Sequence, residues 1–171
     1  LYKEKYYTFN NIRQPNRNRL LWKDNSSDGV KTGHTESAGY CLISSAKRND
    51  MRLIAVVAGA KSDKERFNDT QRLLEYGFRF YSTQEVIKKD NPLKDVDVWG
   101  GKKNLVSLGA ENNIKLTLPR TSFKNITISY DFQNNLRAPI KEGQTLGTLV
   151  IKEGEKTLHT ENLVALNDVE A

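Results

Sequence analysis

The sequence predicts two folded regions, an α/β region of antiparallel strands covered by a helix and then a small all-β sandwich. Two long apolar runs joined by a short polar turn predict paired strands, and a capped amphipathic segment behind them predicts the helix. After residue 82 the pattern changes to short alternating strands separated by turn signals. We therefore expect two domains, residues 1–82 and residues 83–171.

The first stretch, residues 7–20, is polar and rich in Asn and Arg. Pro15 and the asparagines favour extended or turn backbone there rather than helix. Asp28-Gly29 follows, a pair that supplies the positive φ needed by a tight reversal. A short strand is expected over residues 30–35.

Two longer strands are predicted over residues 38–47 and 51–60, because both segments are largely apolar and contain β-branched residues. The polar residues 48–50 between them predict a hairpin connection. The near-continuous apolar character of both segments favours central strands that are covered on both faces of the sheet.

A helix is predicted after these strands. Ser62 and Glu65 form a capping box, in which a cap serine is followed three residues later by a glutamate. Apolar residues then recur at helical spacing to about residue 81: Phe67, Leu74, Phe78 and Tyr81. Gly77 within the helix costs about 1 kcal/mol relative to alanine, which does not change the assignment.

The remainder of the chain predicts short strands and no helix. Residues 84–95 are charged and contain Pro92, which favours a linker or a first edge strand. Alternating apolar residues then predict strands near residues 114–118, 126–130, 149–151 and 163–165.

The composition excludes several classes of protein. The net charge is +6, but Lys and Arg are mixed with Asp and Glu along the chain, so we expect no nucleic-acid partner. A basic surface suits anionic cell-wall polymers or lipid headgroups instead. The single Cys41 can form neither an intrachain disulfide nor a structural zinc site, and we expect its thiol to be buried. We expect the protein to use no metal or cofactor. We expect Trp22 and Trp99 to serve packing rather than ligand contact.

Lys31-Thr32-Gly33 is the one motif with a known catalytic mechanism behind it. An ammonium at this position can polarise a neighbouring hydroxyl and attract an anionic substrate, and the threonine hydroxyl can hydrogen-bond a carboxylate. Glycine allows the substrate backbone to approach the strand closely. A bare tripeptide has little specificity, so its surroundings decide the interpretation.

A longer set of motifs surrounds the triad. It comprises DGVKTGHTESAGYCLISSAKR with NNIRQPNRNRLLW before it and GFRFY after it, then NPLK, the VW pair, SLG and LTLPR. With these motifs the chain resembles low-molecular-mass penicillin-binding proteins of the D-alanyl-D-alanine carboxypeptidase type over nearly its whole length. The resemblance implies that residues 1–82 are the C-terminal part of a β-lactamase/transpeptidase-like catalytic domain and that residues 83–171 are a C-terminal all-β domain.

The resemblance also implies an activity and a set of roles. The family removes the terminal D-alanine of peptidoglycan pentapeptides through an acyl-enzyme, and β-lactam antibiotics acylate the same serine. Carried over by position, Lys31, Thr32 and Gly33 contact the substrate, and the backbone N–H of His34 contributes to the oxyanion hole. Arg17, in the matching NRN, is expected to bind the terminal carboxylate, for which its planar fork is suited.

The chain departs from the family pattern in one respect. The family's S-x-x-K and S-x-N motifs precede K-T-G, and neither has room here. Ser44 and Lys47 have S-x-x-K spacing, but on a strand such residues point to opposite faces, so we expect no nucleophile in this chain. We therefore expect an N-terminal fragment of the same enzyme to accompany it and carry both motifs. Family members often end in an amphipathic membrane-anchoring helix, and this sequence shows none, so we expect the chain to be soluble. The resemblance implies an exported enzyme, in the periplasm or on the outer face of the cytoplasmic membrane.

Two alternative functions stay open. A β-lactamase would share the K-T-G triad, although the second all-β domain and the IRQPNRN segment favour the carboxypeptidase. A non-catalytic wall-binding module is the alternative from another class, and it predicts that residues 84–171 bind peptidoglycan without turnover.

Overall fold

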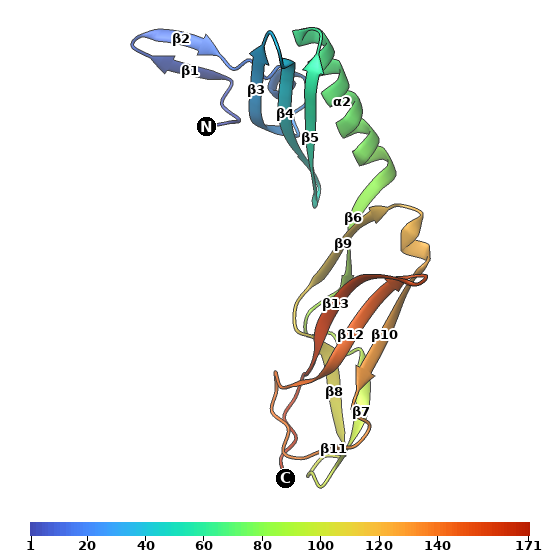
Figure 1. Ribbon diagram of the computed structural model, residues 1–171. Coiled ribbons are helices and arrows are strands. Elements are labelled where there is room, and N and C mark those ends of the chain that lie inside the picture. Colours follow the sequence, from blue (N-terminus) through green and yellow to red (C-terminus); the bar gives the residue numbers. More distant parts are fainter. The chain divides into compact units, whose positions relative to one another are not determined.

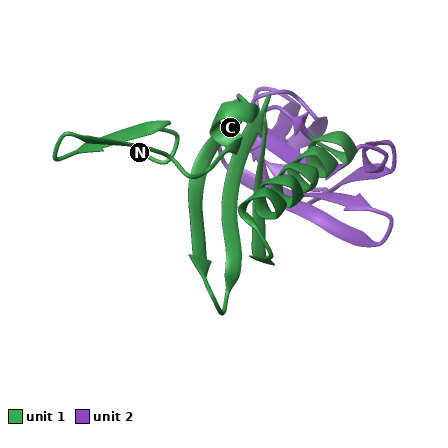
Figure 2. Cartoon of the chain, turned by 90° about the horizontal axis from the view of Figure 1, so that it is seen from above, with its two compact units in different colours: residues 1–82 green, residues 83–171 purple.

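The computed structural model in Figure 1 describes all of residues 1–171. The chain divides into two compact units, residues 1–82 and residues 83–171, which Figure 2 shows in different colours. No helix in the structure combines the length and the apolar character that crossing a membrane requires.

A three-stranded antiparallel sheet in the order β3-β4-β5 forms the centre of the first unit, and β3 is one of its edges. A hairpin and a short helix precede the sheet, and a long helix follows it. The elements are β1 (Tyr6–Phe9), β2 (Ile12–Pro15), α1 (Leu20–Lys23), β3 (Ser27–Thr35), β4 (Gly39–Arg48), β5 (Met51–Ala60) and α2 (Asp63–Phe80). The predicted strand pair and capped helix are thus confirmed, whereas α1 was not predicted.

The helix α2 lies along one face of the sheet (Figure 2). Ser62 caps it, because the serine hydroxyl accepts a hydrogen bond of 3.1 Å from the backbone N–H of Glu65. Leu74 is 2% exposed and packs with Phe78 against the apolar residues of β4 and β5. Gly77 lies where the helix meets Leu53, and a Cβ at this position would require the end of the Leu53 side chain to move. A glycine here lets the leucine pack closely against the helix.

The opposite face of the sheet is open in this chain. Three apolar side chains project from this open face and are largely exposed: Ile43 (43%), Ile54 (66%) and Val56 (63%). The prediction that both long strands are covered on both faces is therefore wrong for this chain, in which α2 covers one face and no element covers the other. Cys41 is half-buried rather than buried, because its cross-strand partner Gly33 has no side chain to cover it.

An ion-pair cluster ties the β4–β5 hairpin to the elements around it. The Arg48 guanidinium lies 3.0 Å from the carboxylate of Asp24 and 2.8 Å from that of Glu75. Burial alone would raise the pKa of the Asp24 carboxyl, but hydrogen bonds from Ser26 and the charge of Arg48 together hold this pKa below its ordinary value.

This depressed pKa predicts a pH dependence of stability. The folded state binds the Asp24 proton less readily than the unfolded state, so the stabilisation is complete above about pH 4 and is lost as the pH falls through the folded-state pKa. We expect the free energy of unfolding of Asp24→Asn to be lower at neutral pH and to fall less steeply below about pH 4. Urea unfolding at a series of pH values measures both, and equal acid slopes for the two proteins would contradict the prediction.

The second unit is all-β apart from one 3-10 turn at Ser122–Lys124, which confirms the predicted class. A six-stranded sheet has the order β10-β12-β13-β8-β7-β11, and β6 pairs with β9. The strands are β6 (Tyr81–Ile87), β7 (Lys94–Trp99), β8 (Leu105–Ala110), β9 (Ile114–Pro119), β10 (Ile126–Phe132), β11 (Leu136–Arg137), β12 (Thr145–Glu153) and β13 (Lys156–Ala165). Residues of both sheets share one core, in which Val106, Leu149 and Leu163 are fully buried.

Strands β7 and β8 were not predicted. In β7 the buried Val96 and Val98 alternate with Asp95 and Asp97, so a strand signal was present there and was overlooked. In β8 the signal is weaker, because the segment contains Ser107 and Gly109. Trp99, at the end of β7, is 68% exposed, so the expectation that it serves packing is wrong.

Candidate active site

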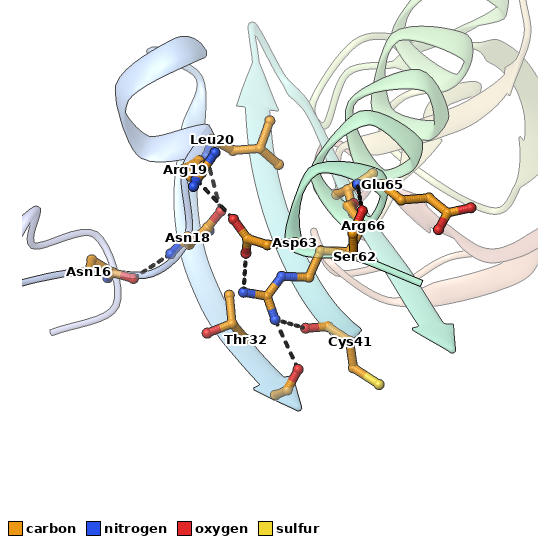
Figure 3. A network of polar contacts seen from close by, with 12 residues as sticks. Asn16, Asn18, Arg19, Leu20, Thr32, Cys41, Ser62, Asp63, Glu65 and Arg66 are labelled. Atoms are coloured by element: carbon orange, nitrogen blue, oxygen red, sulfur yellow. Dashed lines mark hydrogen bonds and ion pairs between the residues drawn. The ribbon is translucent and has the colours of Figure 1, made fainter. Parts of the chain in front are cut away.

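A pocket of about 630 Å³ opens in the first unit, beside β3. Three parts of the chain line it: α1 with the segment that leads into it, the second half of β3 with Tyr40 of β4, and the start of α2. Figure 3 shows polar contacts among residues of these parts. The lining residues are Pro15, Asn16, Arg17, Arg19, Trp22, Thr32, Gly33, His34, Tyr40, Asp63 and Arg66. Four of the five predicted site residues are among them, and Lys31 is not.

The K-T-G residues divide between the two faces of the sheet because successive side chains of a strand alternate. Thr32 pairs with Leu42 on the α2 face and is 8% exposed. Lys31 pairs with Ile43 on the open face, and its ammonium donates a hydrogen bond of 2.6 Å to the Thr32 carbonyl. The structure thus brings Thr32, Gly33 and His34 to the pocket and places Lys31 on the other face.

Asn18 fixes the segment that carries Arg17. Its side chain is fully buried and donates a hydrogen bond of 3.0 Å to the Gly29 carbonyl at the start of β3. The same side chain accepts a hydrogen bond of 3.2 Å from the backbone N–H of Leu20, at the start of α1. The exposed Arg17 is therefore attached to a backbone that is tied to the K-T-G strand, and its guanidinium is free to meet an anion in the pocket.

A buried arginine joins the start of α2 to the end of the K-T-G strand (Figure 3). Arg66 is 5% exposed, and its guanidinium donates to the carbonyls of Gly33, at 2.9 Å, and Cys41, at 3.3 Å. It also forms an ion pair with Asp63, which in turn lies 2.9 Å from the Nε of Arg19. One carboxylate therefore links a buried and an exposed arginine at the pocket wall.

Aromatic rings complete the pocket. The rings of His34 and Tyr40 stack with their centroids 4.0 Å apart, and the Arg66 guanidinium carbon lies 5.3 Å from the centre of the Tyr40 ring. Trp22 lines the pocket and is 37% exposed, so it is not confined to packing as predicted. The pocket combines arginine side chains, a hydroxyl and backbone groups, which suits an anionic peptide end.

Two family models account for nearly the whole chain. One, described as D-alanyl-D-alanine carboxypeptidase, matches residues 1–62, and the other, described as penicillin-binding protein 5, C-terminal domain, matches residues 81–171. The second match covers more than half of the chain. This chain belongs to the D-alanyl-D-alanine carboxypeptidase family.

The D-alanyl-D-alanine carboxypeptidase DacC of Escherichia coli is 47% identical over 99% of this chain. DacA of Haemophilus influenzae is 40% identical over the same share. Among solved structures, penicillin-binding protein 5 of Haemophilus influenzae matches 99% of this chain with a TM-score of 0.80 and 39% identity, and the chain covers 50% of it. The chain spans 43% of the length of DacC and 44% of that of the DacA protein.

This carboxypeptidase family member has no solvent-accessible serine at the S-x-x-K spacing of residues 44–47. Ser44 is fully buried and donates a hydrogen bond of 3.0 Å to the Gly29 carbonyl, while Lys47 is exposed. The two side chains therefore do not meet.

Three residues of the pocket and its supports were not predicted from the sequence: Arg66, Asp63 and Asn18. One signal was present for the arginine, because the buried face of α2 carries residues spaced by four: Arg66, Thr70, Leu74 and Phe78. An arginine on the apolar stripe of a helix is held there by a specific partner. No comparable signal marked Asn18, since asparagine is common in turns for local reasons.

Proposed function

We propose that this chain forms the K-T-G side of the active site of a serine-type D-Ala-D-Ala carboxypeptidase that binds penicillin. The observation that carries the proposal is the pocket in which Thr32, Gly33, His34 and Arg17 meet, in a chain that belongs to this family. The proposed substrate is a peptidoglycan pentapeptide, which ends in the carboxylate of D-alanine.

The proposed reaction has two steps. A serine hydroxyl attacks the carbonyl carbon of the penultimate D-alanine, the peptide C–N bond breaks, and the terminal D-alanine leaves with the serine proton on its nitrogen. Water then hydrolyses the ester and restores the serine. A β-lactam antibiotic opens its ring in the first step and stays attached as an ester.

The chain's residues have distinct proposed roles in these steps. The Thr32 hydroxyl and the Arg17 guanidinium bind the terminal carboxylate of the substrate, and Gly33 lets the peptide lie close to β3. The His34 N–H donates to the oxyanion that develops in both steps. Lys31 contributes its positive charge beside the serine.

The position of Lys31 supports a serine supplied from the open face of the sheet. Lys31, Ile43 and Val56 lie in one row across β3, β4 and β5 on that face. Exposed apolar side chains on a sheet are a surface that a further part of the protein covers. We propose that the portion carrying S-x-x-K and S-x-N packs there, which brings the Lys31 ammonium to the serine.

The cellular setting is also a proposal. Peptidoglycan lies outside the cytoplasmic membrane, so we place the enzyme in the periplasm or on the outer face of that membrane, associated with the membrane surface. The net charge of +6 supports contact with anionic wall polymers or lipid headgroups.

The test uses the complete protein that contains this chain and a serine-bearing portion. We expect intact-mass analysis to show one penicillin attached after incubation, and we expect D-alanine release from a pentapeptide that ends in D-Ala-D-Ala. Heat-denatured protein is the control. Rapid hydrolysis of penicillin without D-alanine release would identify a β-lactamase, and peptidoglycan binding by residues 84–171 without any acylation would identify a wall-binding module.

A further inference from the structure

We propose that Arg66 is a positioning residue that holds the peptide group between Gly33 and His34, and so aims the oxyanion donor of the site. The inference rests on the proposed function, in which the His34 N–H stabilises the oxyanion. Its basis is the hydrogen bond of 2.9 Å from the Arg66 guanidinium to the Gly33 carbonyl.

The carbonyl of Gly33 and the N–H of His34 belong to one peptide unit. This unit is planar, and in the trans form its C=O and N–H point in opposite directions. A guanidinium that fixes the carbonyl therefore also fixes the direction of the N–H. Glycine leaves the backbone at position 33 more freedom than other residues would, so an external restraint on this unit has a large effect.

The charge of Arg66 acts on the same unit. A cation at the carbonyl oxygen withdraws electron density through the conjugated peptide bond, which makes the N–H at the other end a stronger donor. The charge of Arg66 therefore stabilises an oxyanion bound by this N–H, although the guanidinium and the oxyanion are not in contact. Hydrogen bonds that involve an ionised group are about twice as strong as neutral ones, so the restraint on Gly33 is firm.

Arg66 itself is held rigidly. It is 5% exposed, its second carbonyl partner is Cys41, the cross-strand partner of Gly33, and its carboxylate partner is Asp63 at the start of α2. The planar fork of arginine can contact these groups at the same time, whereas the single ammonium of lysine cannot do so with the same geometry. Arg66 is assigned to positioning rather than to substrate contact, because its side chain is buried and its guanidinium is already engaged by two carbonyls and one carboxylate.

The experiment compares Arg66→Met, Arg66→Lys and the unaltered complete enzyme. The rate of acylation by penicillin is measured together with the infrared stretching frequency of the ester carbonyl in the acyl-enzyme, which falls as hydrogen bonds to that oxygen strengthen. We expect Arg66→Met to acylate about ten- to a hundredfold more slowly. Its ester carbonyl is expected to absorb at a higher frequency than that of the unaltered enzyme. The acylation rate and carbonyl frequency of Arg66→Lys should lie between those of Arg66→Met and those of the unaltered enzyme.

Arg72→Met is the matched control. Arg72 is on the same helix and contacts Asp69 with the same spacing of three residues as Arg66 and Asp63, but its side chain is 82% exposed. We expect this variant to keep the rate and the carbonyl frequency of the unaltered enzyme, because it touches neither the pocket nor β3.

The outcomes separate the inference from the proposed function. Acylation of the unaltered enzyme together with an unchanged rate and carbonyl frequency in Arg66→Met overturns the inference alone. No acylation of the unaltered enzyme removes the proposed function and the inference with it. If Arg66→Met does not fold, as circular dichroism would show, Arg66→Lys is compared with the unaltered enzyme, since lysine keeps the charge but lacks the planar fork. Slower acylation and a higher carbonyl frequency in Arg66→Lys support the inference, and unchanged values overturn it.

Discussion

Replacing Lys31 with alanine in the complete enzyme is expected to slow acylation by penicillin by about two to three orders of magnitude. The ammonium is the positive charge that the proposed site directs at the serine. The Lys31 side chain lies on the opposite face of the sheet from α2, outside the core cluster of the first unit, so its removal leaves no cavity in that core. The second-order rate constant for acylation, followed with a fluorescent penicillin, measures the effect.

Lys47→Ala is the matched control for this change. Lys47 is an exposed lysine of the neighbouring strand β4, and the alternation of that strand places it on the same face as Ile43. It lies farther along the sheet from the pocket, so we expect its loss to leave the rate within about twofold of the unaltered enzyme. Equal rates for Lys31→Ala and the unaltered enzyme would contradict the role assigned to Lys31.

Replacing Leu74 with alanine is expected to lower the free energy of unfolding by about 2–5 kcal/mol. Leu74 is 2% exposed and belongs to the cluster that joins α2 to the sheet. The smaller side chain loses its apolar burial and leaves a cavity. Because α2 also carries Arg66 and Asp63, loosening this helix should disturb the pocket wall as well.

The neighbouring leucine provides the control. Leu73 is 50% exposed on the same helix, so Leu73→Ala should change the free energy of unfolding by about 0.5 kcal/mol or less. Urea unfolding followed by the fluorescence of Trp22, in a Trp99→Phe background, reports on the first unit. Similar effects of the two substitutions would contradict the packing of α2 described above.

Local signals allowed much of the fold to be predicted. The serine cap of α2 and the two apolar runs before it are local sequence signals, and the structure confirms the capped helix and both strands. Strand β8 escaped prediction because its burial depends on partners such as β13, which is distant in sequence, rather than on its own pattern. Strand β7 shows alternating valine and aspartate, a strand signal that was overlooked. The open face of the first sheet could not be predicted either. The apolar composition of a strand predicts that the strand is buried, but it does not identify the part of the protein that covers it.

The candidate site was predictable where it follows a motif. Thr32, Gly33, His34 and Arg17 were named from the sequence, and the structure brings them to one pocket. The supporting contacts were not predictable, because Arg66 reaches Gly33 across 33 positions of the chain. Strand alternation was available in the sequence, and it explains why Lys31 and Thr32 lie on opposite faces of the sheet.

The proposed active site can be tested with a crystal structure of the complete protein after reaction with penicillin. We expect the carboxylate of the bound penicillin to lie within hydrogen-bonding distance of the Thr32 hydroxyl, and its ester carbonyl oxygen to accept a hydrogen bond from the His34 N–H. The same structure should show a serine from outside this chain bonded to the ligand. Penicillin attached elsewhere, with Thr32 and His34 facing solvent, would contradict the account.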